Sequence, residues 1–264
     1  MERPLVSAAW YDPGVVRERA GEIRLSLQWE KLSTDMGHAA AVTAGEPVLH
    51  SWSGGKDSCL ALDALLADET RTVVALLTTV TAGFDRVSMH GVRLEVIRRQ
   101  ADALGFPLDV VVIPQQATNA AYEACMERAL ARHLDAGVRT IAFGDLFLDD
   151  VRDYRERWLA GTGMTPIFPI WHRDTQALAR RFIDEGFQAI LTCVDTRVLA
   201  PSFAGRAFDH ALLANLPAAI DPCGENGEFH TFVSDGPLFR QPVRVVRGEV
   251  VQRDAWRFCD LLPG

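Results

Sequence analysis

A pair of glycines flanked by hydroxyl side chains is the feature that most constrains this chain. The hexapeptide 53–58, Ser-Gly-Gly-Lys-Asp-Ser, joins a short apolar run to an amphipathic stretch. Glycine has no Cβ, so the backbone can turn sharply and approach an anion, and the first amides of the helix that follows are donors at the positive end of its dipole. The residues predicted to bind a phosphate in this way are Ser53, Gly54, Gly55, Lys56, Asp57 and Ser58.

The hexapeptide does not follow the commoner Walker A pattern. That pattern has Gly-Lys followed by Ser or Thr, with a further Gly five residues upstream of the Gly-Lys glycine. Here Asp57 follows Lys56, and His50 occupies the upstream position. The alternative interpretation is an ordinary Gly-rich turn between a strand and a helix, with Asp57 as a helix N-terminal cap.

Apolar, β-branched runs alternate with helical spacings from residue 47 onward. The predicted strands cover 48–52, 72–80, 107–113 and 139–143, and the predicted helices cover 58–67, 91–104 and 119–134. This alternation is typical of an α/β fold whose parallel sheet carries helices on its faces. The sequence therefore predicts a nucleotide-binding domain over 46–145.

Polar clusters follow three of the predicted strands. The first is the hexapeptide, the second contains His90, and the third is Gly144 with Asp145. In an open parallel sheet the ligand binds beyond the carboxyl ends of the strands, so we expect these clusters to converge on one nucleotide. His90 would contact phosphate or ribose, or else be a hydrogen-bonded loop histidine. Asp145 would bind a metal or the nucleotide, or else cap a helix.

The chain changes character after this point. An Arg-rich helix carries Arg152 and Arg155, and a further helix and strand are predicted at 174–185 and 189–194. We therefore expect 146–264 to form a second, smaller α/β domain that binds the substrate.

The first part of the chain differs from the two predicted domains. Residues 1–45 alternate charged with scattered apolar side chains and develop no strand pattern. The sequence predicts an N-terminal extension, either flexible or forming an amphipathic helix over 14–31 that docks on the domain.

Composition limits the partners and the compartment. The 264 residues carry a formal net charge of −8, so a large positive field that would attract nucleic acid is absent. The five cysteines are odd in number and form no C-x-x-C pair, and no run of 18 apolar residues occurs. We therefore expect a cytoplasmic protein with no membrane segment and no nucleic-acid partner, as a monomer or an oligomer.

Several segments together resemble one family. They are the hexapeptide 53–58, Met89-His90, Gly144-Asp145, Tyr154-Arg155, Pro169-Ile170-Trp171 and the octapeptide 224–231, Gly-Glu-Asn-Gly-Glu-Phe-His-Thr. The hexapeptide is identical to the signature of the PP-loop ATP pyrophosphatases. The whole set is similar to the diphthine ammonia ligase (diphthamide synthase) family, in the subgroup often called adenine nucleotide alpha hydrolases. Two positions depart from the family pattern, since His230 stands where Glu is usual and Asn226 where Gly is frequent.

The resemblance implies a HUP-like, PP-loop domain and an ATP-dependent amidation. A substrate carboxylate would attack the α-phosphate of ATP, pyrophosphate would leave, and ammonia would displace AMP from the acyl adenylate. Lys56, the amides of Gly54 and Gly55 and a Mg²⁺ ion held by Asp57 would stabilise the departing pyrophosphate. The acceptor would be a carboxylate-bearing small molecule or a modified protein side chain.

The remaining candidates lie in the second half. The predicted catalytic residues are Lys56, Asp145 and Glu228, and the predicted substrate-binding residues are Arg152, Arg155, Glu225, Asn226 and Glu228. Glu225 and Glu228 occupy a turn between glycines, where one would bind ammonium and the other act as a base, unless the turn is merely an exposed acidic one. Arg152 and Arg155 would clamp a carboxylate or phosphate, or form a solvated helix face.

Two other functions are open at this stage. One is a tRNA-modifying enzyme on the same nucleotide-binding fold, which the negative net charge and the absence of a C-x-x-C pair disfavour. The other is a protein that only senses an adenine nucleotide and reports it through a partner.

Overall fold

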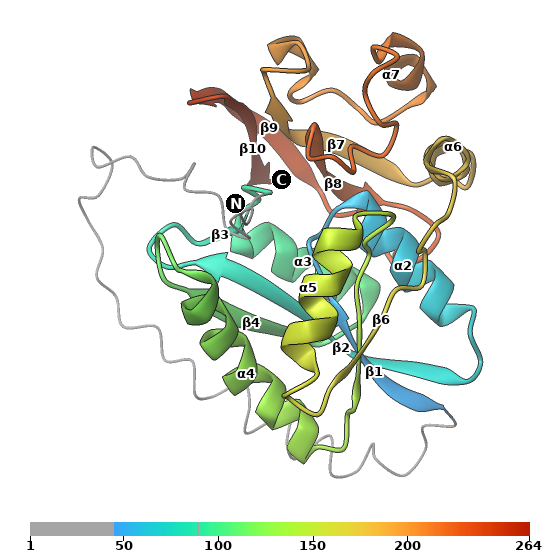
Figure 1. The fold of residues 1–264 in the computed structure, drawn as a ribbon. Coiled ribbons are helices and arrows are strands. Elements are labelled where there is room, and N and C mark those ends of the chain that lie inside the picture. The colour runs from blue at the N-terminus through green and yellow to red at the C-terminus, as the bar shows by residue number, and fades with distance from the viewer. Residues whose placement is uncertain (1–44, 89) are drawn as a thin grey trace.

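The computed structural model describes residues 45–88 and 90–264, and within them the chain forms two sheets (Figure 1). The strands of the first sheet are β1 (Glu46–Ser51), β2 (Arg71–Thr81), β3 (Arg86–Val87), β4 (Leu108–Ile113), β5 (Thr140–Ala142) and β6 (Thr165–Ile167). The order β4-β2-β1-β5-β6 is parallel throughout, and β3 pairs antiparallel with the end of β2. The predicted α/β fold with a parallel sheet is therefore confirmed.

Helices cover both faces of this sheet. They are α2 (Lys56–Leu66), α3 (Leu94–Leu104), α4 (Asn119–Asp135) and α5 (Asp149–Leu159). Successive strand residues point to opposite faces, so Val48 packs in the cluster that contains α2 and α3, and Leu49 in the cluster that contains α4 and the end of α5. Buried strands of this kind read as continuous apolar runs, which is why the sequence located them.

The second sheet is antiparallel, in the order β8-β7-β10-β9. Its strands are β7 (Gln188–Asp195), β8 (Phe229–Asp235), β9 (Val245–Arg253) and β10 (Trp256–Pro263), accompanied by α6 (Thr175–Asp184), α7 (His210–Asn215) and the 3₁₀ turn η1 (Pro201–Phe203). The predicted helix and strand at 174–185 and 189–194 are α6 and β7. The second sheet confirms a second, smaller domain, which stands at one end of the first in Figure 1.

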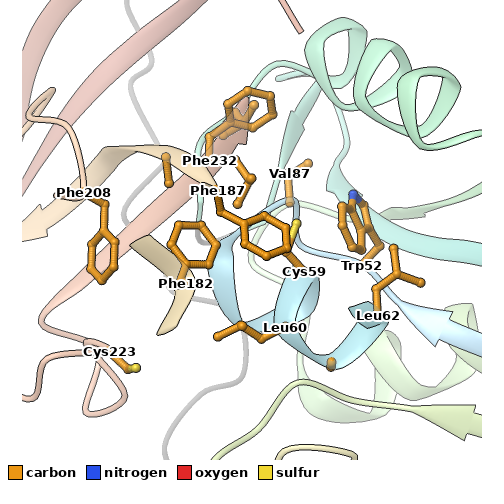
Figure 2. Close-up of a cluster of buried hydrophobic side chains, with 14 of the residues drawn as sticks. Trp52, Cys59, Leu60, Leu62, Val87, Phe182, Phe187, Phe208, Cys223 and Phe232 are labelled. Atoms are coloured by element: carbon orange, nitrogen blue, oxygen red, sulfur yellow. The ribbon is translucent and has the colours of Figure 1, made fainter. Parts of the chain in front are cut away.

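An apolar cluster joins the two domains. Figure 2 shows Phe182 and Phe187 beside Cys59 of α2, and Phe182 stacks on Phe187 with ring centroids 4.9 Å apart. All three side chains are at most 3% exposed. Because this junction is packed as a continuous core, the second domain is held firmly against the helix that begins at the hexapeptide.

The first sheet extends beyond residue 145, because β6 pairs with β5. We therefore propose a domain boundary between Ile167 and Asp174 rather than at 145. The predicted extension over 1–45, with its helix at 14–31, lies outside the described residues except for Gly45.

All five cysteines are buried and free. In the part of the chain that the structure describes, no helix combines the length and the apolar character needed to cross a membrane.

Candidate functional site

The hexapeptide lies at the point where the sheet reverses its order. The chain builds β2 and β4 on one side of β1 and then crosses to place β5 and β6 on the other. The crevice beyond the carboxyl ends of β1 and β5 is therefore the site where ligands bind in folds of this type. The turn 53–58 follows β1, and Gly144 and Asp145 follow β5 closely, so the structure brings these two predicted clusters together.

Gly54 is required by both conformation and space. Its φ is +79°, and a Cβ there would lie 2.5 Å from Cδ1 of Ile97 and 2.8 Å from Oε1 of Gln100. The fully buried Gln100 fixes this part of the turn, because its Nε2 donates to the carbonyl of Gly54 at 3.0 Å. The same side chain accepts from Nε1 of Trp52 at 2.9 Å. The turn is thus built into the domain core and is preorganised.

The hydroxyl groups of two serines form hydrogen bonds within the turn. The amide of Gly55 donates to Oγ of Ser53 at 3.2 Å, and Oγ of Ser58 donates to the carbonyl of Gly55 at 3.0 Å. The two serine hydroxyls lie 3.0 Å apart. Gly55 is the N-cap of α2 and makes no side-chain cap bond, so the first turn of the helix presents its amides next to these hydroxyls. This arrangement suits an anion.

Gly144 packs directly on the first turn of α2. A Cβ at this position would lie 2.9 Å from both the carbonyl carbon and oxygen of Asp57, and 3.0 Å from the amide nitrogen of Ser58. These neighbours are backbone atoms, which cannot rotate away as a side chain can. The segment after β5 therefore fits against the turn 53–58 only because residue 144 has no side chain.

Lys56 is 2% exposed and links the turn to the second domain. Its Nζ donates to the two carboxylate oxygens of Asp57 at 2.9 and 2.8 Å and to the carbonyl of Cys223. Burial alone would lower the pKa of Lys56, but the charge of Asp57 and its hydrogen bond, together with the acidic groups of Cys223 and Glu225, raise it overall, so the ammonium stays protonated. The amide of Lys56 also donates to Oγ1 of Thr231 in β8 at 3.0 Å.

Glu225 closes the site from the opposite side. Its Oε1 accepts from the amides of Leu146 and Phe147, just after β5, at 2.8 and 3.3 Å. Burial, assisted by the nearby charge of Asp57, raises the pKa of Glu225 to about 7. A carboxyl group tuned to this range can exchange a proton near neutral pH, which is what a general acid or base requires.

Glu228 is 5% exposed and has one unsatisfied oxygen. Its Oε1 accepts from the amide of Asp221 at 3.1 Å and from Nδ2 of Asn226 at 3.0 Å. Its Oε2 is buried and has no hydrogen-bond partner among the described residues. Leaving a carboxylate oxygen unpaired in the interior is costly, so this atom marks a position that favours a cationic or hydrogen-bond-donating ligand.

His90 reaches the turn from the segment after β3. Its ring carbon Cε1 lies 3.2 Å from the position of a Cβ on Gly55, and its Nδ1 lies 3.4 Å from the carbonyl oxygen of Thr231. The ring centroid of His230 is 4.5 Å away. Burial lowers the pKa of His90 to about 4, with help from the charge of Lys56. Burial also lowers the pKa of His230 well below its usual value, with help from His90 and Lys56, so both imidazoles are neutral at pH 7.

The two predicted arginines have different surroundings. Nε and Nη2 of Arg155 donate to the two carboxylate oxygens of Asp145 at 2.6 and 3.2 Å, so these predicted site residues already satisfy each other. The guanidinium of Arg152 lies 4.9 Å from the ring centroids of both Phe168 and Trp171, and its Nε donates to Glu156. Within the described residues the terminal nitrogens of Arg152 have no partner, so its fork is available to a ligand.

The carboxylates do not form a ready-made metal site. Within residues 45–88 and 90–264 no group of three or more His, Cys, Asp or Glu side chains has the arrangement needed to hold an ion. Asp57, the predicted Mg²⁺ ligand, has both oxygens bonded to Lys56. This donor set fits Mg²⁺ only in the usual manner of nucleotide sites, where one or two carboxylates and the phosphates share the ion.

Two residues that shape the site, Gln100 and Thr231, were not among the predicted site residues. Thr231 ends the octapeptide that carried the family resemblance, and that position was the available signal. Gln100 lies on a helix with ordinary spacing, so nothing local marked it. Cys223 directly precedes the octapeptide, and it meets Lys56 through its carbonyl group.

The fold and the turn at the switch point define a nucleotide-binding α/β protein of the PP-loop type with an added antiparallel domain. The model of the diphthamide synthase N-terminal domain matches residues 47–166, and that of the diphthamide synthase C-terminal domain matches 174–262. The chain therefore belongs to the diphthamide synthase family.

Curated relatives agree with this assignment. The chain is 26% identical over 234 residues to the diphthine--ammonia ligase of Schizosaccharomyces pombe. This match covers 81% of the chain and 38% of the Schizosaccharomyces pombe protein. It is 27% identical over 229 residues to the diphthine--ammonia ligase of Homo sapiens, and this match covers 78% of the chain and 85% of the human protein. With the Bos taurus protein the match is 29% over 127 residues, 46% of this chain and 48% of the bovine one. The chain thus spans less than half the length of the Schizosaccharomyces pombe and Bos taurus relatives that it matches.

Proposed function

We propose that this protein is an ATP-dependent ligase that converts a substrate carboxylate into an amide. The observation that carries the proposal is the contact between the phosphate-binding turn and the acidic turn of the second domain. Lys56 bonds to the carbonyl of Cys223, and Glu225 bonds to the amide of Leu146. A nucleotide in the turn would therefore have its α-phosphate next to carboxylates suited to handling ammonia, in agreement with the names of the relatives.

The first half-reaction is adenylation. A carboxylate oxygen of the acceptor forms a bond to the α-phosphorus of ATP, and the bond from that phosphorus to the bridging oxygen breaks, which releases pyrophosphate. The amides at the start of α2, the hydroxyls of Ser53 and Ser58 and the ammonium of Lys56 would bind the leaving pyrophosphate. Asp57 would hold a Mg²⁺ ion shared with the phosphates, and the ion would supply further charge neutralisation.

The second half-reaction is transfer of ammonia. The nitrogen lone pair attacks the acyl carbon of the adenylate, the carbon–oxygen bond to AMP breaks, and the product is the amide plus AMP. Oε2 of Glu228, buried and without a partner among the described residues, would bind the ammonium ion. Glu225 would accept the proton that ammonium must lose before its nitrogen can attack.

The acceptor would approach from the carboxyl ends of β5 and β6. The guanidinium of Arg152 lies there against two adjacent aromatic rings, those of Phe168 and Trp171, and offers its terminal nitrogens. A planar fork of this kind pairs with both oxygens of a carboxylate. The acceptor is accordingly a carboxylate on a small molecule or on a modified protein side chain.

Product analysis of the whole protein tests the proposal. Incubation with ATP, Mg²⁺, ammonium and a metabolite or protein extract should release AMP and pyrophosphate, and should yield a species one dalton lighter by mass spectrometry, because OH becomes NH₂. Lys56→Ala should abolish both changes while circular dichroism shows a retained fold. Formation of ADP in place of AMP by the unmodified protein would contradict the proposed reaction.

A further inference from the structure

Asp260 occupies an irregular position in the last strand. The pairing of β10 with β9 shifts register between Cys259 and Leu261, and Asp260 lies at that shift. Irregularities of this kind redirect a side chain and are frequent beside functional sites. The carboxylate of Asp260 points away from its own sheet and toward the first domain, where its side chain is only 16% exposed.

Two arginines of the first domain converge on this carboxylate. Nη1 of Arg86 donates to it at 2.7 Å, and Nη2 of Arg93 donates at 2.6 Å, with Nε of Arg93 adding bonds at 3.1 and 3.2 Å. Burial would raise the pKa of Asp260, but its hydrogen bonds to Arg93 and Arg86 and their charges lower it to about 2. Asp260 is therefore an anion at neutral pH.

The two arginines flank His90 in the sequence. Arg86 and Arg93 form a bridge across the base of this segment, and Nη1 of Arg86 also donates to the carbonyl of Gly91 at 2.7 Å. Asp260 thus holds both ends of the segment that carries His90. Among the described residues, the hydrogen bonds of its carboxylate go to these two arginines and not to the turn 53–58.

We propose that Asp260 is a positioning residue for nucleotide binding, which fixes His90 against the phosphate-binding turn through Arg86 and Arg93. Charge-assisted bonds to a forked arginine are strong and directional, so they determine the position of the backbone that bears them. The second domain therefore contributes to nucleotide affinity from its far C-terminal strand. This inference rests on the proposed function only in that the turn is taken to bind ATP.

The test compares two carboxylates that each join the domains. Asp260→Asn removes the charge that holds the His90 segment. Asp63→Asn is the matched control, because the ion pair of Asp63 in α2 is with Arg181 of α6 and does not involve that segment. Titration calorimetry with α,β-methylene-ATP should give a dissociation constant at least tenfold weaker for Asp260→Asn and changed less than twofold for Asp63→Asn. In turnover, Asp260→Asn should raise KM for ATP and leave KM for ammonium unchanged.

Hydrogen exchange gives a readout that needs no nucleotide. The backbone amide hydrogens of peptides that contain Arg86 to Arg93 should exchange faster in Asp260→Asn than in the wild type. In Asp63→Asn they should exchange at the wild-type rate. If Asp260→Asn does not fold, Arg93→Gln provides the same test, since Arg86 still bonds to Asp260 in that variant. Unchanged affinity or exchange in the Asp260 variant, or equal losses in both carboxylate variants, would overturn the inference. A wild-type protein that binds no analogue would contradict the proposed function, and the exchange data would still decide whether Asp260 positions the segment.

Discussion

Replacing Gly144 with alanine adds one methyl group at the tightest contact of the proposed ATP site. The new Cβ would lie 2.9 Å from the carbonyl group of Asp57 and 3.0 Å from the amide nitrogen of Ser58. Carbon atoms normally approach such atoms no closer than about 3.5 Å, so either the segment after β5 or the start of α2 must shift by about half an ångström. Since both are backbone, no rotation of a side chain relieves the contact.

The size of the effect follows from the cost of forcing a methyl group into a packed region, which is about 1–3 kcal/mol. If the start of α2 gives way, its amides leave their preorganised positions, and the same energy appears as lost affinity for ATP. At about 1.4 kcal/mol for each factor of ten, the dissociation constant should rise by about 5- to 150-fold. If the cost appears in folding instead, the melting temperature should fall by about 2–4 °C for each kcal/mol.

Calorimetric titration with α,β-methylene-ATP and a thermal melt measure these two quantities. Gly161→Ala is the matched control, because a Cβ at Gly161 would meet nothing within 4 Å and its φ is not in the left-handed region. The control should bind and melt like the wild type. A Gly144→Ala protein that keeps wild-type affinity and melting temperature would refute the reasoning that residue 144 is closed to any side chain by the turn.

Two further predictions concern the acidic turn. The pKa of Glu225 is raised from 4.5 to about 7, so between these values the folded protein binds more protons than the unfolded chain, and the free energy of unfolding should fall as the pH rises through this window. In denaturant titrations, the free energy of unfolding of the wild type should be lower at pH 7.5 than at pH 5, and Glu225→Gln should lack this decrease. An equal decrease in both proteins would contradict the raised pKa. Glu228→Gln should raise KM for ammonium by about tenfold, as expected for loss of a charged hydrogen bond. KM for ATP should be unchanged. A rise in KM for ATP alone would contradict the placement of Glu228 in the ammonium site.

The sequence was sufficient for the nucleotide-binding domain because each of its signals is local. A strand buried on both faces reads as an apolar run, and the following helix has a different period, so β1, β2 and β4 were located with α2, α3 and α4. The short strands β3 and β6 have two and three residues and leave no detectable pattern. Because β6 was missed, the sequence placed the domain boundary at 145, before the last strand of the first sheet.

The second sheet was harder to predict because its pairing is non-local. β7 lies between β8 and β10, and β10 lies between β7 and β9. The order of the strands in the sheet therefore differs from their order in the sequence. The same limit applied to the site. Nothing local indicates that Oγ1 of Thr231 accepts from the amide of Lys56, 175 residues earlier, or that Arg155 donates to the carboxylate of Asp145.

A crystal structure with bound α,β-methylene-ATP would show directly where the triphosphate lies. We expect the β- and γ-phosphates within hydrogen-bonding distance of the amides and hydroxyls of residues 53–58, with the α-phosphate facing Glu225 and Glu228. A triphosphate bound away from this turn, or one whose α-phosphate faces away from the acidic turn, would contradict this expectation.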